Sequence, residues 1–314
     1  MKLSKKTRIE LMKHVKKIGV VVAILLLPLS LWYLLIKTND FEVVIKAKTS
    51  PGTIYKNVLD WNKGLNKGTT STNILKKTPF KNIVHSYHFE SYNLEMDWHI
   101  HRVNDSISSV SIGINDLDNS LKTRVHKLLG TSPLEKLIAQ EFSGFNTVLV
   151  NHIAQFRVAI DGQEESPEAY VAYVNIACHQ DKKADNMIMN STYINSFLQE
   201  NGLKVVSNPF LEVVDWNIPT GQVNFNFCFP IEQGKNLPKH EEIQYKKVAA
   251  KKALKATFHG NYSYTDEAWF ALYQYSQDHQ IKRLNTITEI FYENPHTAGI
   301  KDIEWEAGIY MEVE

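Results

Sequence analysis

The sequence lacks the short motifs on which most nucleotide and acyl-transfer chemistry depends. It contains no phosphate-binding loop, no Rossmann glycine run and no serine-centred elbow. Only two cysteines occur, Cys178 and Cys228, and neither belongs to a CxxC pair. Two cysteines are too few for a disulfide framework. They could form one bond in an oxidising compartment, or remain free thiols buried in their apolar runs.

A basic surface is also missing from most of the chain. The formal net charge is +1 over 314 residues, but residues 1–17 alone hold seven Lys or Arg and one Glu. The remaining residues are therefore net acidic and have no cationic face with which to neutralise phosphates. With no helix-turn-helix pattern either, we expect no direct contact with nucleic acid.

A long uncharged run follows the basic start. Residues 18–36, "IGVVVAILLLPLSLWYLLI", contain no charged side chain over nineteen positions, which is enough to cross the hydrocarbon as a helix. A cleaved signal peptide is the alternative, but its apolar core is about 7–15 residues long and ends in small residues. The run therefore predicts a retained transmembrane helix, with Trp32 and Tyr33 at the membrane interface.

The positive flank of this run predicts its orientation. An excess of Lys and Arg before a membrane helix keeps that end in the cytoplasm, so residues 1–17 are expected to be a cytoplasmic tail. The prediction is a single-pass protein of the inner (cytoplasmic) membrane whose other domains are extracytoplasmic, or periplasmic.

Residues 38–160 show the pattern of an α+β domain. Phe41 to Ala47 alternate as in a strand, and Ser50-Pro51 marks the start of a helix. Strand-like runs follow at 82–90, 94–103 and 106–114. A long amphipathic helix is predicted over 132–156, because apolar residues recur on one stripe: Leu134, Leu137, Ile138, Phe142, Phe145, Leu149, Ile153 and Phe156.

This order of elements, with the phrase "SPGTIYKNVLDWNKG", resembles the START-like superfamily, which includes the polyketide-cyclase-like (SRPBCC) domains. In this helix-grip fold a sheet curls around one long helix and leaves an apolar cavity between them. The resemblance implies a ligand cavity within 38–160 without indicating the ligand.

From residue 163 onward a unit occurs twice, at 163–233 and at 241–314. Each copy is predicted to fold as strand, helix, strand, strand. "FLEVVDWN" at 210–217 aligns without a gap with "ITEIFYEN" at 287–294, so that Glu212 corresponds to Glu289. A duplicated unit predicts two copies that join their antiparallel sheets about a pseudo-twofold axis.

Residues 163–314, the two copies together, resemble the GyrI-like domains, the effector-binding domains of AraC-type bacterial transcription activators. The resemblance rests on "ATFHGNYSYTDEAWFAL" (256–272), "EIFYENP" (289–295) and "WEAGIYMEV" (305–313). Glu312 departs from the usual proline, which the first copy keeps as Pro230. The resemblance implies a groove between the repeats. In several members a buried acid among aromatic rings attracts hydrophobic cations, and a few members hydrolyse reactive small molecules.

Strand alternation indicates which side chains could line this groove. Glu306 and Tyr310 fall on one face of the last strand, while Glu289 and Phe291 alternate along the preceding strand. If these faces coincide, the four residues share one concavity. A carboxylate beside aromatic rings can hold a cation or act as a general base. The alternative is that the acids face solvent on an uncovered sheet face.

Three further aromatic residues are candidate ligand contacts. Tyr262 and Trp269 lie at the start of the second-copy helix, where the resemblance places pocket walls, and Tyr292 follows Phe291 in the strand. Core packing is the alternative for Tyr262 and Trp269. Of the twelve histidines, His99 and His101 point to one face, but no third ligand completes a zinc spacing. We expect neither a metal nor a cofactor.

These observations predict a membrane-anchored extracytoplasmic protein that binds or senses an amphipathic or cationic organic molecule. One alternative is a small-molecule hydrolase that uses a groove carboxylate to activate water. The other is a non-catalytic protein-interaction module whose cavities are filled by side chains. The sequence does not identify a protein partner.

Overall fold

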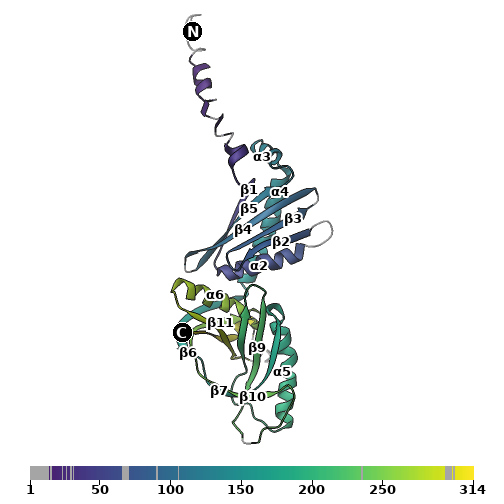
Figure 1. The fold of residues 1–314 in the computed structure, drawn as a ribbon, viewed down its shortest axis with the longest axis vertical. Helices are drawn as coiled ribbons and strands as arrows, with labels where there is room; N and C mark the ends of the chain where they lie inside the picture. The colour runs from purple at the N-terminus through teal and green to yellow at the C-terminus, as the bar shows by residue number, and fades with distance from the viewer. Residues whose placement is uncertain are drawn as a thin grey trace, which may run out of the picture.

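The computed structural model describes residues 14, 16–22, 24–25, 27–28, 30, 32–65, 71–89, 91–104, 106–234, 236–293, 299 and 301–314. Within these residues the chain is α+β and contains a five-stranded and an eight-stranded antiparallel sheet. Figure 1 shows the smaller sheet above the larger one, with α2 and α6 between them. The predicted α+β class with antiparallel sheets is therefore confirmed.

The first sheet has the strand order β1-β5-β4-β3-β2. Its strands are β1 (Phe41–Ala47), β2 (Ser71–Thr78), β3 (Asn82–Phe89), β4 (Tyr92–Asn104) and β5 (Ile107–Asp116). The helices of this half are α2 (Pro51–Leu65), α3 (Ser120–Leu128) and α4 (Pro133–Ile153). The α4 helix starts after Ser132, whose hydroxyl accepts a hydrogen bond from the Glu135 backbone N–H at 3.3 Å, an arrangement that satisfies one otherwise unpaired donor.

Aromatic side chains pack between this sheet and α4. Trp98 of β4 is fully buried, and its ring lies 5.5 Å from that of Phe142 and 5.2 Å from that of Phe145. Phe156, expected as the last residue of the long helix, instead begins the next strand, because α4 ends at Ile153. Membership of this half in the START-like superfamily remains a prediction.

The second sheet has the order β10-β7-β9-β8-β12-β13-β11-β6. One copy of the repeated unit comprises β7 (Ala169–His179), α5 (Lys183–Glu200), β8 (Phe210–Asn217) and β9 (Gln222–Pro230). The other comprises β11 (Lys252–Gly260), α6 (Asp266–Asp278), β12 (Arg283–Phe291) and β13 (Glu306–Val313). Two more strands, β6 (Phe156–Glu165) and β10 (Gln244–Val248), form the edges. Each edge strand precedes one copy but pairs with the other, β6 with β11 and β10 with β7.

Two short links require this sheet to curl. β6 and β7 are six positions apart in the strand order, as are β10 and β11, so a flat sheet would hold each pair about 29 Å apart. The links 166–168 and 249–251 allow four peptide units each, which span at most about 15 Å. The two links also meet: the Ser166 N–H donates to the Lys251 carbonyl at 2.8 Å, and the Lys251 N–H donates to the Ser166 hydroxyl at 3.1 Å.

The predicted transmembrane helix is wrong. Among the described residues no helix is both long enough and apolar enough to cross a membrane. Among the described residues of this segment, 16–22 are α-helical and Trp32–Ile36 are π-helical. The assignment to the inner membrane loses its basis with the helix. Most of the predicted tail at 1–17 lies outside the described residues.

The two halves meet where α2 begins. Gly52 lies directly against α6, since a Cβ on Gly52 would come within 2.6 Å of the Phe270 side chain. Next to it, the Thr53 hydroxyl donates to Glu267 Oε2 at 2.5 Å, and His152 Nε2 lies 2.7 Å from Glu267 Oε1. Burial raises the pKa of Glu267. One buried carboxylate of α6 therefore contacts both α2 and the end of α4.

Candidate functional site

The two faces of the eight-stranded sheet have different surroundings. One face packs on α5 and α6 and contributes to the main hydrophobic core. The opposite face carries a smaller buried cluster comprising Val171, Phe210, Cys228, Val248, Ala253, Ile290 and Tyr310. Within the described part of the chain no helix covers this cluster, so its burial comes from the curl of the sheet. We call this side the inner face.

Glu289 belongs to the helix-covered face and is fully buried. Its Oε1 atom lies 2.6 Å from Lys183 Nζ, and its Oε2 accepts a hydrogen bond from the Thr265 hydroxyl at 2.9 Å. The Lys183 ammonium also lies 4.3 Å from the centroid of the Trp269 ring. The carboxylate and the aromatic ring expected to hold a ligand cation thus hold an ammonium group of the chain itself.

Glu212 lies on the inner face. It is 7% exposed, accepts a hydrogen bond from Asn226 Nδ2 at 2.8 Å, and forms an ion pair with Lys246 of the edge strand β10. The Lys246 ammonium also lies 4.7 Å from the centroid of the Tyr173 ring. The inner face therefore contains a carboxylate, an aromatic ring and a cation between them.

A one-residue offset separates the two glutamates. Glu212 pairs with Thr288 across the β8–β12 contact, whereas Glu289 pairs with Leu211. Residues directly opposite in a ladder share a face and neighbours along a strand alternate, so Glu212 and Glu289 point to opposite faces. The gapless alignment of 210–217 with 287–294 is therefore out of register with the structure, because a shift of one residue exchanges the two faces.

The same alternation separates the predicted site residues. Phe291 shares the helix-covered face with Glu289, and its ring lies 4.8 Å from that of Tyr262. The Tyr262 hydroxyl donates to the Glu306 carbonyl at 2.8 Å and accepts from the Glu293 N–H at 3.0 Å. Trp269 is fully buried. The structure therefore does not bring Glu289 and Phe291 into one concavity with Glu306 and Tyr310.

Tyr310 and Tyr292 lie together on the inner face. The Tyr292 and Tyr310 hydroxyls share a hydrogen bond, and desolvation raises the pKa of both phenols. The close approach requires Gly308, since a Cβ at that position would come within 2.5 Å of the Tyr292 hydroxyl. Two neutral phenols thus extend the inner face beyond Glu212, with Thr288 between Glu212 and Tyr310 in the ladder.

Glu306 occupies the same face at the far end of β13. Its side chain is 43% exposed and lies 3.9 Å from His259 Nε2. Four residues separate it from Tyr310, which corresponds to about 13 Å along a strand. Glu306 is therefore a rim residue of the inner face.

Sequence reasoning did not single out the two lysines that neutralise the buried acids. Lys183 is the first residue of α5, where a cation is unfavourable because it opposes the helix dipole. This unfavourable position is the signal in the sequence that Lys183 pairs with an acid elsewhere in the chain. Lys246 stands in the short strand "QYKKV", whose alternation alone does not show which strand it joins. Only the pairing of β10 with β7 brings Lys246 to Glu212.

The structure also places the cysteines and histidines that the sequence analysis considered. Cys178 and Cys228 are free thiols, and burial raises the pKa of Cys228. His99 lies 3.0 Å from Asp97 on an exposed part of β4. Among the described residues no group of three or more His, Cys, Asp or Glu is placed to hold a metal ion.

Comparison with known proteins gives one family. The GyrI-like small molecule binding domain matches residues 153–314. This range is half of the chain and includes all the strands of the eight-stranded sheet. None of the curated proteins compared with the chain matches it.

Several solved structures are similar to part of the chain. The EcmrR C-terminal domain has a TM-score of 0.43 and 18% identity over 51% of this chain and 98% of its own. SAV2435 bound to tetraphenylphosphonium has a TM-score of 0.37 and 9% identity, over 50% and 94% of the two chains. A hydrolase from Listeria innocua has a TM-score of 0.32 and 9% identity, over 49% of this chain and 92% of its own.

Proposed function

The chain belongs to the GyrI-like small molecule binding domain family, and from this premise we propose that it binds amphipathic organic cations on the inner face, at Glu212. The observation that carries the proposal is the Lys246 ammonium, which lies against both the Glu212 carboxylate and the Tyr173 ring. A carboxylate and an aromatic face together are the two groups that attract a cation with apolar substituents. Lys246 occupies the position that a ligand cation takes.

Lys246 differs from Lys183 in being displaceable. The Lys183 side chain is 2% exposed, whereas that of Lys246 is 29% exposed and extends from an edge strand. A ligand cation can therefore replace the Lys246 ammonium while that group moves into water, at little desolvation cost. Tyr310 and Tyr292 provide the adjacent aromatic surface, and Glu306 lies at its rim. Glu289 retains its internal partner.

Titration of the full chain with tetraphenylphosphonium tests this proposal. Breaking a desolvated charge pair costs about 2–5 kcal/mol of binding, so Glu212→Gln is expected to weaken binding at least roughly tenfold. Lys246→Met removes the internal competitor and is expected to tighten binding. The neutral triphenylphosphine oxide, of similar shape, should respond to neither substitution. Isothermal titration calorimetry measures the affinity of each ligand for the unmodified chain and for both variants.

Glu306→Gln is the matched control on the same face. Its side chain is 43% exposed and lies on β13, four positions from the strand of Tyr173 in the sheet, so its loss is expected to change the affinity for the cation less than twofold. Equal effects of Glu212→Gln and Glu306→Gln would show that the acids act only through the general field of the sheet. An unchanged affinity in Lys246→Met would show that the ligand does not replace this ammonium.

A further inference from the structure

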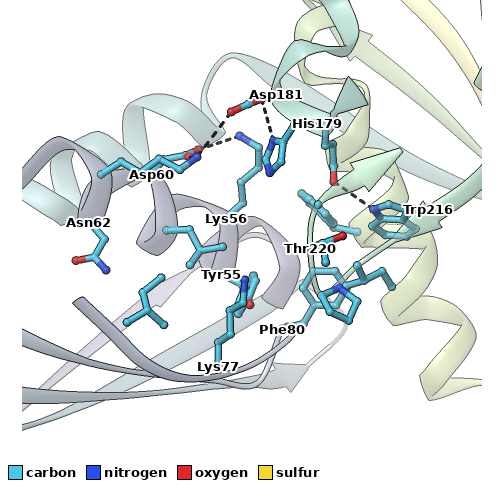
Figure 2. A pocket seen from close by; sticks show the side chains of 18 of the residues that line it. Tyr55, Lys56, Asp60, Asn62, Lys77, Phe80, His179, Asp181, Trp216 and Thr220 are labelled. Carbon is cyan, nitrogen blue, oxygen red and sulfur yellow. Dashed lines mark hydrogen bonds and ion pairs between the residues drawn. The ribbon is translucent and has the colours of Figure 1, made fainter. Parts of the chain in front are cut away.

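A pocket lies between the two halves of the chain, away from the inner face. It has a volume of 390 Å³ and is lined by α2 and β2 on one side and by the β7–α5 link and the β8–β9 turn on the other. Small-molecule sites occur preferentially at such junctions and measure roughly 300–1,000 Å³. Figure 2 shows the charged groups Lys56, Asp60, His179 and Asp181 along one side and Tyr55, Lys77 and Phe80 along the other.

Four aromatic rings from both halves form the apolar wall. The Phe80 ring lies 5.6 Å from Tyr55, 6.2 Å from Trp216 and 5.4 Å from Phe270. Phe80 has a φ of 62°, a left-handed conformation that is unfavourable for a bulky residue. Such a conformation persists only where packing holds it in place, so contacts between the two halves fix the position of the Phe80 ring.

Two buried polar groups in this pocket have no partner. Tyr55 and Asn62 are each 4% exposed, and neither the Tyr55 hydroxyl nor the Asn62 Oδ1 atom has a hydrogen-bond partner among the described residues. Leaving a buried polar group unpaired costs about 1–3 kcal/mol. Burial raises the pKa of Tyr55 to about 12, so the phenol keeps its proton at neutral pH. Both atoms are enclosed by the chain, so the polar contacts available to a ligand come from the charged side chains that line the pocket.

The charges of the pocket are unevenly paired. Lys56 Nζ lies 2.9 Å from Asp60, Lys63 Nζ lies 3.1 Å from Asp60, and His179 Nδ1 lies 2.8 Å from Asp181. Both carboxylates are therefore engaged. Lys77 also lines the pocket, and no carboxylate of the described chain pairs with it.

We propose that this pocket binds a small aromatic carboxylic acid. The ring packs against Phe80 and Trp216, and the carboxylate pairs with Lys77. The ligand is thus opposite in charge to the one proposed for the inner face. Because it contacts α2 and the β8–β9 turn together, it also holds the two halves of the chain against each other.

Titration of the full chain with 2-naphthoate and with its neutral isostere 2-naphthamide tests the proposal. Lys77→Met is expected to weaken naphthoate binding three- to tenfold and to leave the amide unchanged. Lys76→Met is the matched control, because Lys76 is the neighbouring exposed lysine of β2 and does not line the pocket. Glu212→Gln should leave naphthoate binding unchanged, which separates this site from the inner face.

No naphthoate binding at millimolar concentration would overturn the proposal. Equal losses in Lys77→Met and Lys76→Met would also overturn it, because they would indicate general attraction to a basic surface.

Discussion

Two glutamates that look equivalent along the chain have different physical environments. Glu289 is buried against helices and is paired with an equally buried ammonium, while Glu212 is paired with a lysine that reaches it from an edge strand. Both are neutralised by the chain itself. The difference lies in whether the neutralising group can move into water, and that decides which acid is open to an external cation.

Glu289→Gln should lower stability strongly and leave cation binding unchanged. It leaves the Lys183 ammonium buried without a counter-charge, which costs about 3–5 kcal/mol. Urea unfolding followed by circular dichroism measures the loss. The double variant Lys183→Met with Glu289→Leu removes both charges and should recover most of the stability. If Glu289→Gln unfolds at the same urea concentration as the unmodified chain, the pair is not buried as described.

Helix α2 packs unusually closely on α6 because of one residue. Gly52, in the first turn of α2, has the Phe270 side chain 2.6 Å from where its Cβ would lie, whereas Gly64 in the last turn of the same helix has no heavy atom within 4 Å of that position. The absence of a side chain at Gly52 therefore sets the distance between the halves, and Gly64 has no such role.

Gly52→Ala and Gly64→Ala form a matched pair. Overpacking a well-packed site costs about 1–3 kcal/mol, so Gly52→Ala is expected to lower the free energy of unfolding by that amount. Gly64→Ala should raise it by up to about 1 kcal/mol, the difference in helix propensity between the two residues. Chemical denaturation measures both. Equal, stabilising effects would show that α2 and α6 are not in direct contact.

The two halves are joined by a small number of specific contacts. Phe80 projects from the turn between β2 and β3 into rings of the second half, and Glu267 of α6 accepts hydrogen bonds from Thr53 and His152 of the first. Because these groups contact both halves, they are expected to couple the unfolding of one half to that of the other.

Phe80→Ala is therefore expected to uncouple the halves. Loss of a buried phenylalanine costs about 3–5 kcal/mol, and here the loss falls on the contact between the halves. Thermal unfolding followed by tryptophan fluorescence and by circular dichroism should change from coincident to separate transitions. Phe80→Leu, which keeps most of the apolar contact, should retain a single transition. Coincident curves in Phe80→Ala would contradict this coupling role.

Local pattern determined most of the elements of this protein. Alternation and helical stripes predicted β1, β3, β4, β5 and α4, because a buried face imposes its period on the sequence whatever it packs against. The repeated strand-helix-strand-strand order in the second half followed from the same signals. The GyrI-like family assignment followed from short motifs that the fold places on β11 and α6 and on the strands β12 and β13.

Tertiary structure decided what the sequence left open. The face on which an acid lies depends on strand register, and a gapless alignment does not show a shift of one residue. Because of this shift, Glu289 lies on the helix-covered face and Glu212 on the inner face. The partners Lys183 and Lys246 come from distant segments that only the sheet order brings together. The pocket between the halves likewise depends on contacts between α2, Phe80 and the β8–β9 turn, for which local periodicity contains no signal.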